Sequence, residues 1–123
     1  MRVLIVDDSS TMRSLLRMYM KRAGFEVVEA KDGVEALAVL PRAGAVDLML
    51  LDWNMPNMSG LELLTAVRAQ PEYDPMRIMM VTTETELGGM SAALKLGANE
   101  YLMKPFSADA VFSKLEILGL KVA

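Results

Sequence analysis

Val46-Asp47-Leu48-Met49-Leu50-Leu51-Asp52 contains the most apolar of several short runs in this chain, and it ends on an acid. Val46–Leu51, apolar except for Asp47, is typical of a strand that is buried on both faces, as in a parallel sheet. An earlier run, Val3–Val6, is followed in the same way by Asp7 and Asp8. The two runs therefore predict two buried strands that each lead into a carboxylate.

Three further runs predict the remaining strands, at Glu26–Ala30, Ile78–Val81 and Tyr101–Met103. The segments between and after the strands carry apolar residues at helical spacing. The predicted inward-facing residues are Met12, Leu15, Leu16, Tyr19 and Ala23 in a helix over 11–23, then Val34, Leu37 and Leu40, then Leu61, Leu64 and Val67, and finally Ala108, Val111, Phe112 and Leu115.

Residues that cap or terminate helices support these assignments. Ser59-Gly60-Leu61-Glu62 has the spacing of a capping box, and Ser107 is a suitable cap for the last helix. Pro41 predicts an early or distorted end of the second helix. A weaker helix is expected over Leu87–Leu96, because each glycine of Gly88-Gly89 costs about 1 kcal/mol relative to alanine.

Strands and helices thus alternate five times, which predicts an α/β fold with a doubly wound, five-stranded parallel sheet and right-handed crossovers. With 123 residues and no linker-like segment, we expect one domain over residues 1–123. In such sheets the functional crevice lies beyond the carboxyl ends of the strands. The pattern alone therefore selects the residues to inspect.

Composition excludes several classes of function. The chain has no cysteine and no histidine, which removes thiolate chemistry, histidine-based acid–base catalysis and most zinc sites. A net charge of −3 argues against a nucleic-acid surface, and the basic residues near the N-terminus fit a solvated helix face. The apolar run that begins at Val3 is broken by Asp7, too soon for a signal peptide, so we expect none. No apolar run reaches the length of about 20 residues that is needed to cross a bilayer. We expect a cytoplasmic protein.

The predicted strands end at Asp7-Asp8, Lys31-Asp32, Asp52, Thr82-Thr83 and Lys104-Pro105. Asp7, Asp8 and Asp52 would project into one crevice if the first and third strands are neighbours. Carboxylates about 4 Å apart repel by about 4 kcal/mol at an effective dielectric of about 20, so the cluster needs a counter-ion. Hard oxygen ligands suit Mg²⁺, and the backbone carbonyl of Asn54 could complete the protein's share of the ligands.

The simpler alternative is that Asp7 and Asp8 only favour the N-terminus of the following helix. The matching positions of Asp52 and Lys104 weigh against it. A carboxylate beside a divalent cation can attack a phosphoryl group and form an acyl phosphate. Lys104 and the Thr82 hydroxyl are placed to hold the remaining phosphoryl oxygens.

The whole chain resembles the receiver domains of two-component response regulators, and most closely the single-domain, CheY-like chemotaxis regulators. The segments that carry this resemblance are Val6–Arg13, Asp32–Leu37, Asp52–Leu64, Met80–Thr82 and Lys104–Phe106. An acidic pair or a Lys-Pro alone would be a weak match, whereas the combination is highly specific.

The resemblance implies a flavodoxin-like sheet with strand order 2-1-3-4-5 and a Mg²⁺ cofactor. It implies that Asp52 is the phosphoacceptor, that Asp7 and Asp8 bind the metal, and that Lys104 pairs with the phosphoryl group. Thr82 and Tyr101 match the hydroxyl and the aromatic that move on activation. The resemblance further implies that the Lys104–Pro105 bond is cis. Asn54 and Glu84 match the family positions that tune the rate of dephosphorylation.

The resemblance also implies partners: a histidine kinase as phosphodonor, since this chain has no histidine, and a downstream protein such as a flagellar switch. The output surface would be formed by the fourth helix, the fifth strand and the fifth helix. We expect a monomer that is a phosphoacceptor and not an enzyme. Two departures stand out: Gly88-Gly89 lies where such regulators usually carry lysines, and Thr83 replaces a smaller alanine and could crowd the movement of Tyr101.

Other interpretations were weighed. A phosphohydrolase of the haloacid dehalogenase type needs an acid two residues after its nucleophile, where this chain has Asn54, and a cap domain for which there is no room. A scaffold that cannot be phosphorylated would lack a site residue, and none is missing. A receiver that is a fragment of a larger regulator or hybrid kinase stays open.

Overall fold

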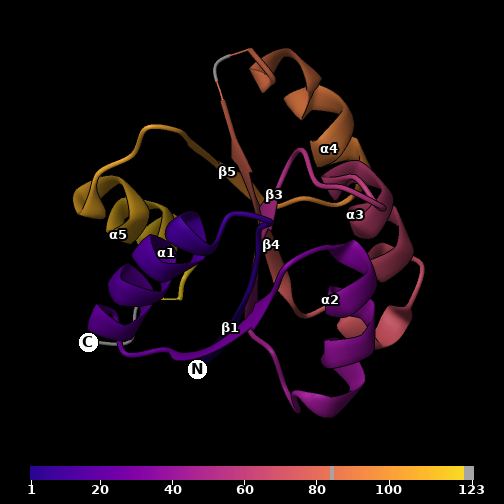
Figure 1. Cartoon of the computed structure of the whole chain (residues 1–123), viewed down its shortest axis with the longest axis horizontal. Coiled ribbons are helices and arrows are strands. Elements are labelled where there is room, and N and C mark those ends of the chain that lie inside the picture. The colour runs from indigo at the N-terminus through magenta and orange to yellow at the C-terminus, as the bar shows by residue number, and fades with distance from the viewer. Residues whose placement is uncertain (84, 121–123) are drawn as a thin grey trace.

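The computed structural model of the protein describes residues 1–83 and 85–120. In this part of the chain, five parallel strands form one sheet in the order β2-β1-β3-β4-β5 (Figure 1). The strands are β1 (Arg2–Val6), β2 (Glu26–Ala30), β3 (Leu48–Asp52), β4 (Arg77–Thr82) and β5 (Glu100–Met103). The predicted doubly wound, flavodoxin-like sheet and its strand order are confirmed.

Helices cover both faces of the sheet. They are α1 (Ser10–Arg22), α2 (Gly33–Val39), α3 (Gly60–Arg68), α4 (Met90–Leu96) and α5 (Ala108–Ile117), with short 3₁₀ turns at Leu40–Arg42, Pro71–Tyr73 and Leu87–Gly89. Figure 1 shows α1 and α5 on one side of the sheet and α2, α3 and α4 on the other. Of the described helices, none is long and apolar enough to cross a membrane.

Each central strand contributes side chains to two separate hydrophobic cores, because successive side chains point to opposite faces of the sheet. In β3, Met49 and Leu51 pack toward the α2–α3–α4 layer, whereas Leu48 and Leu50 pack toward α1 and α5. All four side chains have no exposed surface. Burial on both faces explains why this strand is an unbroken apolar run in the sequence.

Several local predictions are confirmed. Ser59 and Glu62 form both hydrogen bonds of the capping box at the start of α3. The Ser107 side chain accepts the Ala110 N–H and caps α5. Helix α2 ends at Val39, immediately before a 3₁₀ turn that contains Pro41, and the Lys104–Pro105 bond is cis.

Three predicted boundaries or faces are wrong. Strand β3 begins at Leu48, not Val46, because the Asp47 carboxylate accepts the Arg2 N–H and the chain is still in the preceding loop. Val34 is 56% exposed, since α2 turns its small residue Ala36 toward the sheet instead. The helix expected over Leu87–Leu96 is a 3₁₀ turn followed by seven α-helical residues.

Candidate functional site

Three carboxylates meet at the carboxyl edge of the sheet. Asp7 directly follows β1 and Asp52 ends β3, and the two strands are neighbours that pair Val6 with Leu51. One carboxylate oxygen from each of Asp7, Asp8 and Asp52 lies within 4.8 Å of the others. Asp7 and Asp52 are buried whereas Asp8 is exposed, so the cluster opens to solvent on one side. The sheet therefore brings together the three acids that the sequence pattern selected.

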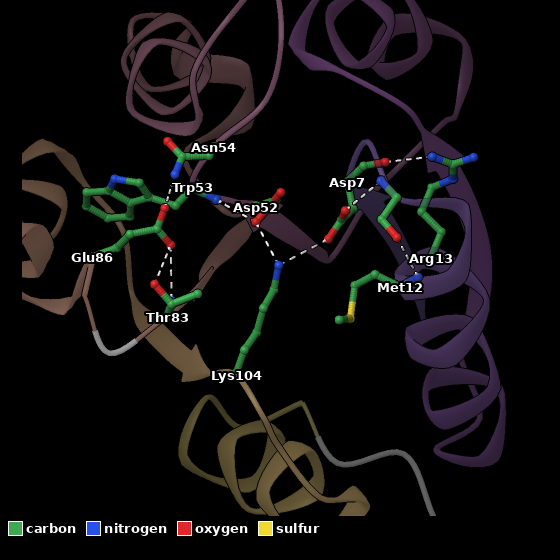
Figure 2. Close-up of polar contacts among 10 residues, drawn as sticks. Asp7, Met12, Arg13, Asp52, Trp53, Asn54, Thr83, Glu86 and Lys104 are labelled. Atoms are coloured by element: carbon green, nitrogen blue, oxygen red, sulfur yellow. Dashed lines mark hydrogen bonds and ion pairs between the residues drawn. The ribbon is translucent and has the colours of Figure 1, made fainter.

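Lys104 extends into this cluster from beyond the end of β5 (Figure 2). Its Nζ lies 3.1 Å from Asp52 Oδ1, which is a hydrogen bond, and 3.8 Å from Asp7 Oδ2. The Lys104 N–H donates to the Thr82 carbonyl at 2.7 Å, which fixes the lysine backbone against the end of β4. The expected meeting of one amine with the acids is confirmed.

Backbone donors hold the two buried acids in place. The Ser9 N–H donates to Asp7 Oδ1 at 2.9 Å, and the Trp53 N–H donates to Asp52 Oδ1 at 3.0 Å. Asp7 Oδ2 is buried and has no hydrogen-bond partner among the described residues. Apart from the ion pair with Lys104, this oxygen is therefore available to a ligand.

The electrostatic state of the site reflects this burial. Burial raises the pKa of Asp52 from 3.8 to about 6; the nearby Asp7 charge adds to the increase, and the hydrogen bond and charge of Lys104 oppose it. Burial also raises the pKa of Asp7, against the Ser9 N–H and Lys104. The effect of burial thus outweighs that of Lys104 at both carboxyls. When the three acids are ionised, they face one lysine, so the cluster carries an excess of negative charge.

The donor set fits a hard divalent cation. Three carboxylate oxygens within 4.8 Å of one another can contact one ion, and the unpartnered Asp7 Oδ2 is one of the oxygens available to it. Oxygen ligands with open positions for water suit Mg²⁺. Within residues 1–83 and 85–120 no hydrogen bond involves the Asn54 carbonyl, and its place in the metal shell stays a prediction.

Thr82 and Tyr101 are the two residues expected to move. Among the described residues, neither side chain forms a hydrogen bond with Asp52. Thr82 is fully buried, and its hydroxyl donates to the Thr83 carbonyl at 3.2 Å. Tyr101 is partly buried, and Lys114 Nζ lies 4.2 Å from the centre of its ring. Both side chains therefore have partners of their own in this state.

Glu86 is a residue that the sequence interpretation missed. Its carboxylate accepts the side-chain amide of Asn54 and both the N–H and the hydroxyl of Thr83 (Figure 2). Thr83 and Glu86 have the Thr-x-x-Glu spacing of a capping box, which was a usable sign of their contact. The hydrogen bond between Asn54 and Glu86 joins residues 32 positions apart, so no local sequence pattern predicts it. Glu84 lies outside the described residues.

Trp53 packs closely against the start of α4. A Cβ placed on Gly89 would lie 2.6 Å from the indole Cζ2, so only glycine allows this approach without a shift. A Cβ on Gly60 would likewise collide with the Asp52 carbonyl oxygen. The glycines that flank the site thus serve close packing around the residue that follows Asp52.

Comparison with known families gives one assignment over most of the chain. Residues 3–116 match the response regulator receiver domain. A chemotaxis protein CheY homolog of Campylobacter jejuni is 46% identical over 121 residues, 97% of this chain and 93% of that protein. The chemotaxis protein CheY1 of Helicobacter pylori is 42% identical over 119 residues, 96% of each chain.

Solved structures agree with the sequence relatives. The chemotaxis response regulator CheY4 of Vibrio cholerae has a TM-score of 0.86 at 38% identity, with 95% of this chain and 97% of that one covered. A probable two-component system response regulator/GGDEF domain protein has a TM-score of 0.90 at 29% identity. It is covered over only 51% of its own length, by 99% of this chain.

Proposed function

We propose that this chain, which belongs to the response regulator receiver domain family, is a signalling switch that is turned on by phosphorylation of Asp52. One observation carries the proposal. The Asp52 carboxylate lies at the mouth of the sheet with Lys104 Nζ at 3.1 Å and the oxygens of Asp7 and Asp8 within 4.8 Å. This arrangement offers a nucleophile, a fixed cation and a site for a divalent ion together.

The chemistry follows from these groups. With a pKa of about 6, Asp52 is mostly ionised at neutral pH and is able to attack phosphorus. One Asp52 oxygen forms the new O–P bond while the P–N bond of a phosphohistidine breaks, and the departing imidazole nitrogen takes up a proton. Lys104 is placed to neutralise phosphoryl oxygens. A bound Mg²⁺, held by Asp7, Asp8 and Asp52, would supply further charge neutralisation.

The phosphodonor histidine lies outside these 123 residues, because the chain has no histidine. A histidine kinase supplies that chemistry, and the relatives with chemotaxis names favour a chemotaxis pathway and a downstream target such as a flagellar switch. The signal passes through Thr82 and Tyr101 to the surface of α4, β5 and α5. Three apolar side chains of that surface, Leu94, Leu96 and Met103, are at least 40% exposed and available to a partner.

A second arrangement has one observation in its favour. The GGDEF-type structure contains a receiver of this shape within a chain about twice as long. The same switch could therefore act inside a longer regulator, with the α4–β5–α5 surface facing another domain of that protein.

Titration with Mg²⁺ and then with beryllofluoride, a phosphoryl mimic, tests the proposal. The fluorescence of Trp53, which follows Asp52 directly, should respond to both additions, and acetyl phosphate should add one phosphoryl group that mass spectrometry detects. Asp52→Asn should lose the beryllofluoride response and the phosphoryl group. Asp109→Asn, the same change at an exposed position on α5, should keep both. Equal phosphorylation of Asp52→Asn and the unchanged chain would refute the assignment.

A further inference from the structure

Glu86 joins the two loops that leave the site at the ends of β3 and β4. Through Asn54, its carboxylate holds the loop that follows Asp52; through the N–H at 3.1 Å and the hydroxyl at 3.0 Å of Thr83, it holds the loop that follows Thr82. One carboxylate thus accepts three donors from two loops. We call this set of contacts among Glu86, Asn54 and Thr83 the loop latch.

The loop latch acts on Thr82 through its neighbour. The Thr82 hydroxyl is bonded to the Thr83 carbonyl, so it is occupied in this state and does not contact Asp52. To donate to a phosphoryl oxygen on Asp52, Thr82 must give up that bond, and the Thr83 peptide must adjust. Thr83 is held at both its N–H and its hydroxyl by Glu86. The latch therefore opposes this adjustment.

Charge works in the same direction. Phosphorylation replaces one negative charge at Asp52 with about two, and the Asn54 amide that could face the new oxygens is bonded to Glu86 instead. A carboxylate that already holds this donor competes with the phosphoryl group for it. The latch also adds a like charge on the same side of the sheet, next to the loop that follows Asp52.

On these grounds we propose that Glu86 is a positioning residue that favours the unphosphorylated arrangement of the site, and that removing its carboxylate raises the affinity for a phosphoryl group. The inference rests on the proposed function, since it concerns the same site. A loss of three hydrogen bonds that exist in only one of two states shifts the equilibrium between those states. We expect about a fivefold gain in affinity, at the low end of typical coupling between sites.

The test is calorimetric titration of beryllofluoride in saturating Mg²⁺. Glu86→Ala should bind it about fivefold more tightly than the unchanged chain. Glu86→Gln keeps an oxygen that can accept from Thr83, so its affinity should fall between the two. Glu72→Ala, the same change at an exposed position in the turn before β4, is the matched control and should leave the affinity unchanged.

A double-mutant cycle isolates the contact. Thr83→Val removes the hydroxyl donor and should raise the affinity less than Glu86→Ala does. The double variant should match Glu86→Ala alone, because the hydroxyl has lost its acceptor there. A merely structural role for Glu86 would lower the affinity of Glu86→Ala or leave it unchanged, and either result overturns the loop latch. If the unchanged chain binds no beryllofluoride, the proposed function fails and the latch fails with it.

Discussion

Helices α3 and α4 follow the two strand ends that matter most, and they begin in opposite ways. Helix α3 begins with a complete capping box, and the Gly60 N–H donates to the Trp53 carbonyl at 3.0 Å. Helix α4 begins after a 3₁₀ turn, with Gly89 at its N-cap and no side-chain cap. Helix α3 is fixed to the loop that follows Asp52 by its own sequence. The second depends on tertiary contacts, above all those of Trp53 and Glu86.

This contrast assigns different tasks to the two regions. The ends of β1 and β3 and the start of α3 hold the acids in one geometry, which a charge-binding site requires. Helix α4 lacks a side-chain cap and follows the contacts between Thr83 and Glu86, so in the proposed switch a change in electrostatics at Asp52 would act on this region. In that proposal, the acids that carry the chemistry and the region that responds lie at different places along the edge of a single sheet. Predictions that probe each region can sharpen or break this division.

The largest effect is expected on the fixed side, at Lys104. Lys104→Met removes the amine that hydrogen-bonds Asp52, and hydrogen bonds to charged groups contribute about 1.5–3 kcal/mol. Beryllofluoride affinity in saturating Mg²⁺ should therefore fall by roughly 10- to 100-fold. Lys95→Met, on the exposed face of α4, is the matched control and should retain affinity within a factor of about two. Equal losses in the two variants would remove Lys104 from the site.

Acidification should stabilise the metal-free protein. The pKa of Asp52 is raised in the folded state, so between pH 3.8 and about 6 the folded chain binds more protons than the unfolded one. The free energy of unfolding should then rise as the pH falls from 7 to 5, by an amount on the order of 1 kcal/mol. Burial acts on the pKa of Asp7 in the same direction.

Urea denaturation in the presence of EDTA measures this dependence. Asp52→Asn should be more stable than the unchanged chain at pH 7 and should show a flatter profile, because the titrating group is gone. Glu26 and Asp32 have lowered pKa values, so their contributions to stability disappear only at lower pH. A free energy of unfolding that decreases between pH 7 and pH 5 would contradict the electrostatic description of the acids.

Alanine substitutions at Gly89 and Gly88 distinguish the effect of packing from that of backbone flexibility at the start of α4. A Cβ on Gly89 would meet the Trp53 ring at 2.6 Å, whereas a Cβ on Gly88 would have nothing within 4 Å. Gly89→Ala should lower the free energy of unfolding by about 1–2 kcal/mol and shift the Trp53 emission. Gly88→Ala should stabilise the protein by about 0.5 kcal/mol, with the emission unchanged. The same small loss in both variants would mean that Trp53 does not depend on this contact.

The contrast between the two helices also explains what the sequence could predict. The start of α3 was predictable because its information is local: Ser59 and Glu62 are three residues apart and bond each other's backbone. The meeting of Asp52 with Asp7 was predictable through the fold, because carboxyl ends of parallel strands meet at one edge. Burial on both faces made β1 and β3 visible as unbroken apolar runs.

The misses have the opposite character. Glu86 contacts Asn54 across 32 positions, and its role depends on how two loops lie in space. The sequence predicts one weak helix over Leu87–Leu96, because the helical cost of Gly88-Gly89 is local information. The packing of Gly89 against Trp53, which accompanies the 3₁₀ turn, is a tertiary contact that the sequence does not show. Val34 was assigned inward from its hydrophobicity, yet Ala36 faces the sheet because α2 packs close to it. In each case a tertiary contact outweighed a local preference.

The smallest expected effect on affinity, that of Ser59→Ala, also tests the division most directly. Ser59→Ala removes the acceptor for the Glu62 N–H at 3.2 Å and should cost about 1 kcal/mol of stability. Because this bond lies within the capping box of α3, we expect it to be unaffected by a phosphoryl group, so beryllofluoride affinity should stay unchanged. Glu86→Ala should change both quantities: under the loop-latch proposal it lowers the stability of the unphosphorylated chain by about as much free energy as it adds to beryllofluoride binding. Urea denaturation and calorimetric titration of both variants measure the two quantities side by side, and an affinity change in Ser59→Ala as large as that in Glu86→Ala would mean that both loops move together.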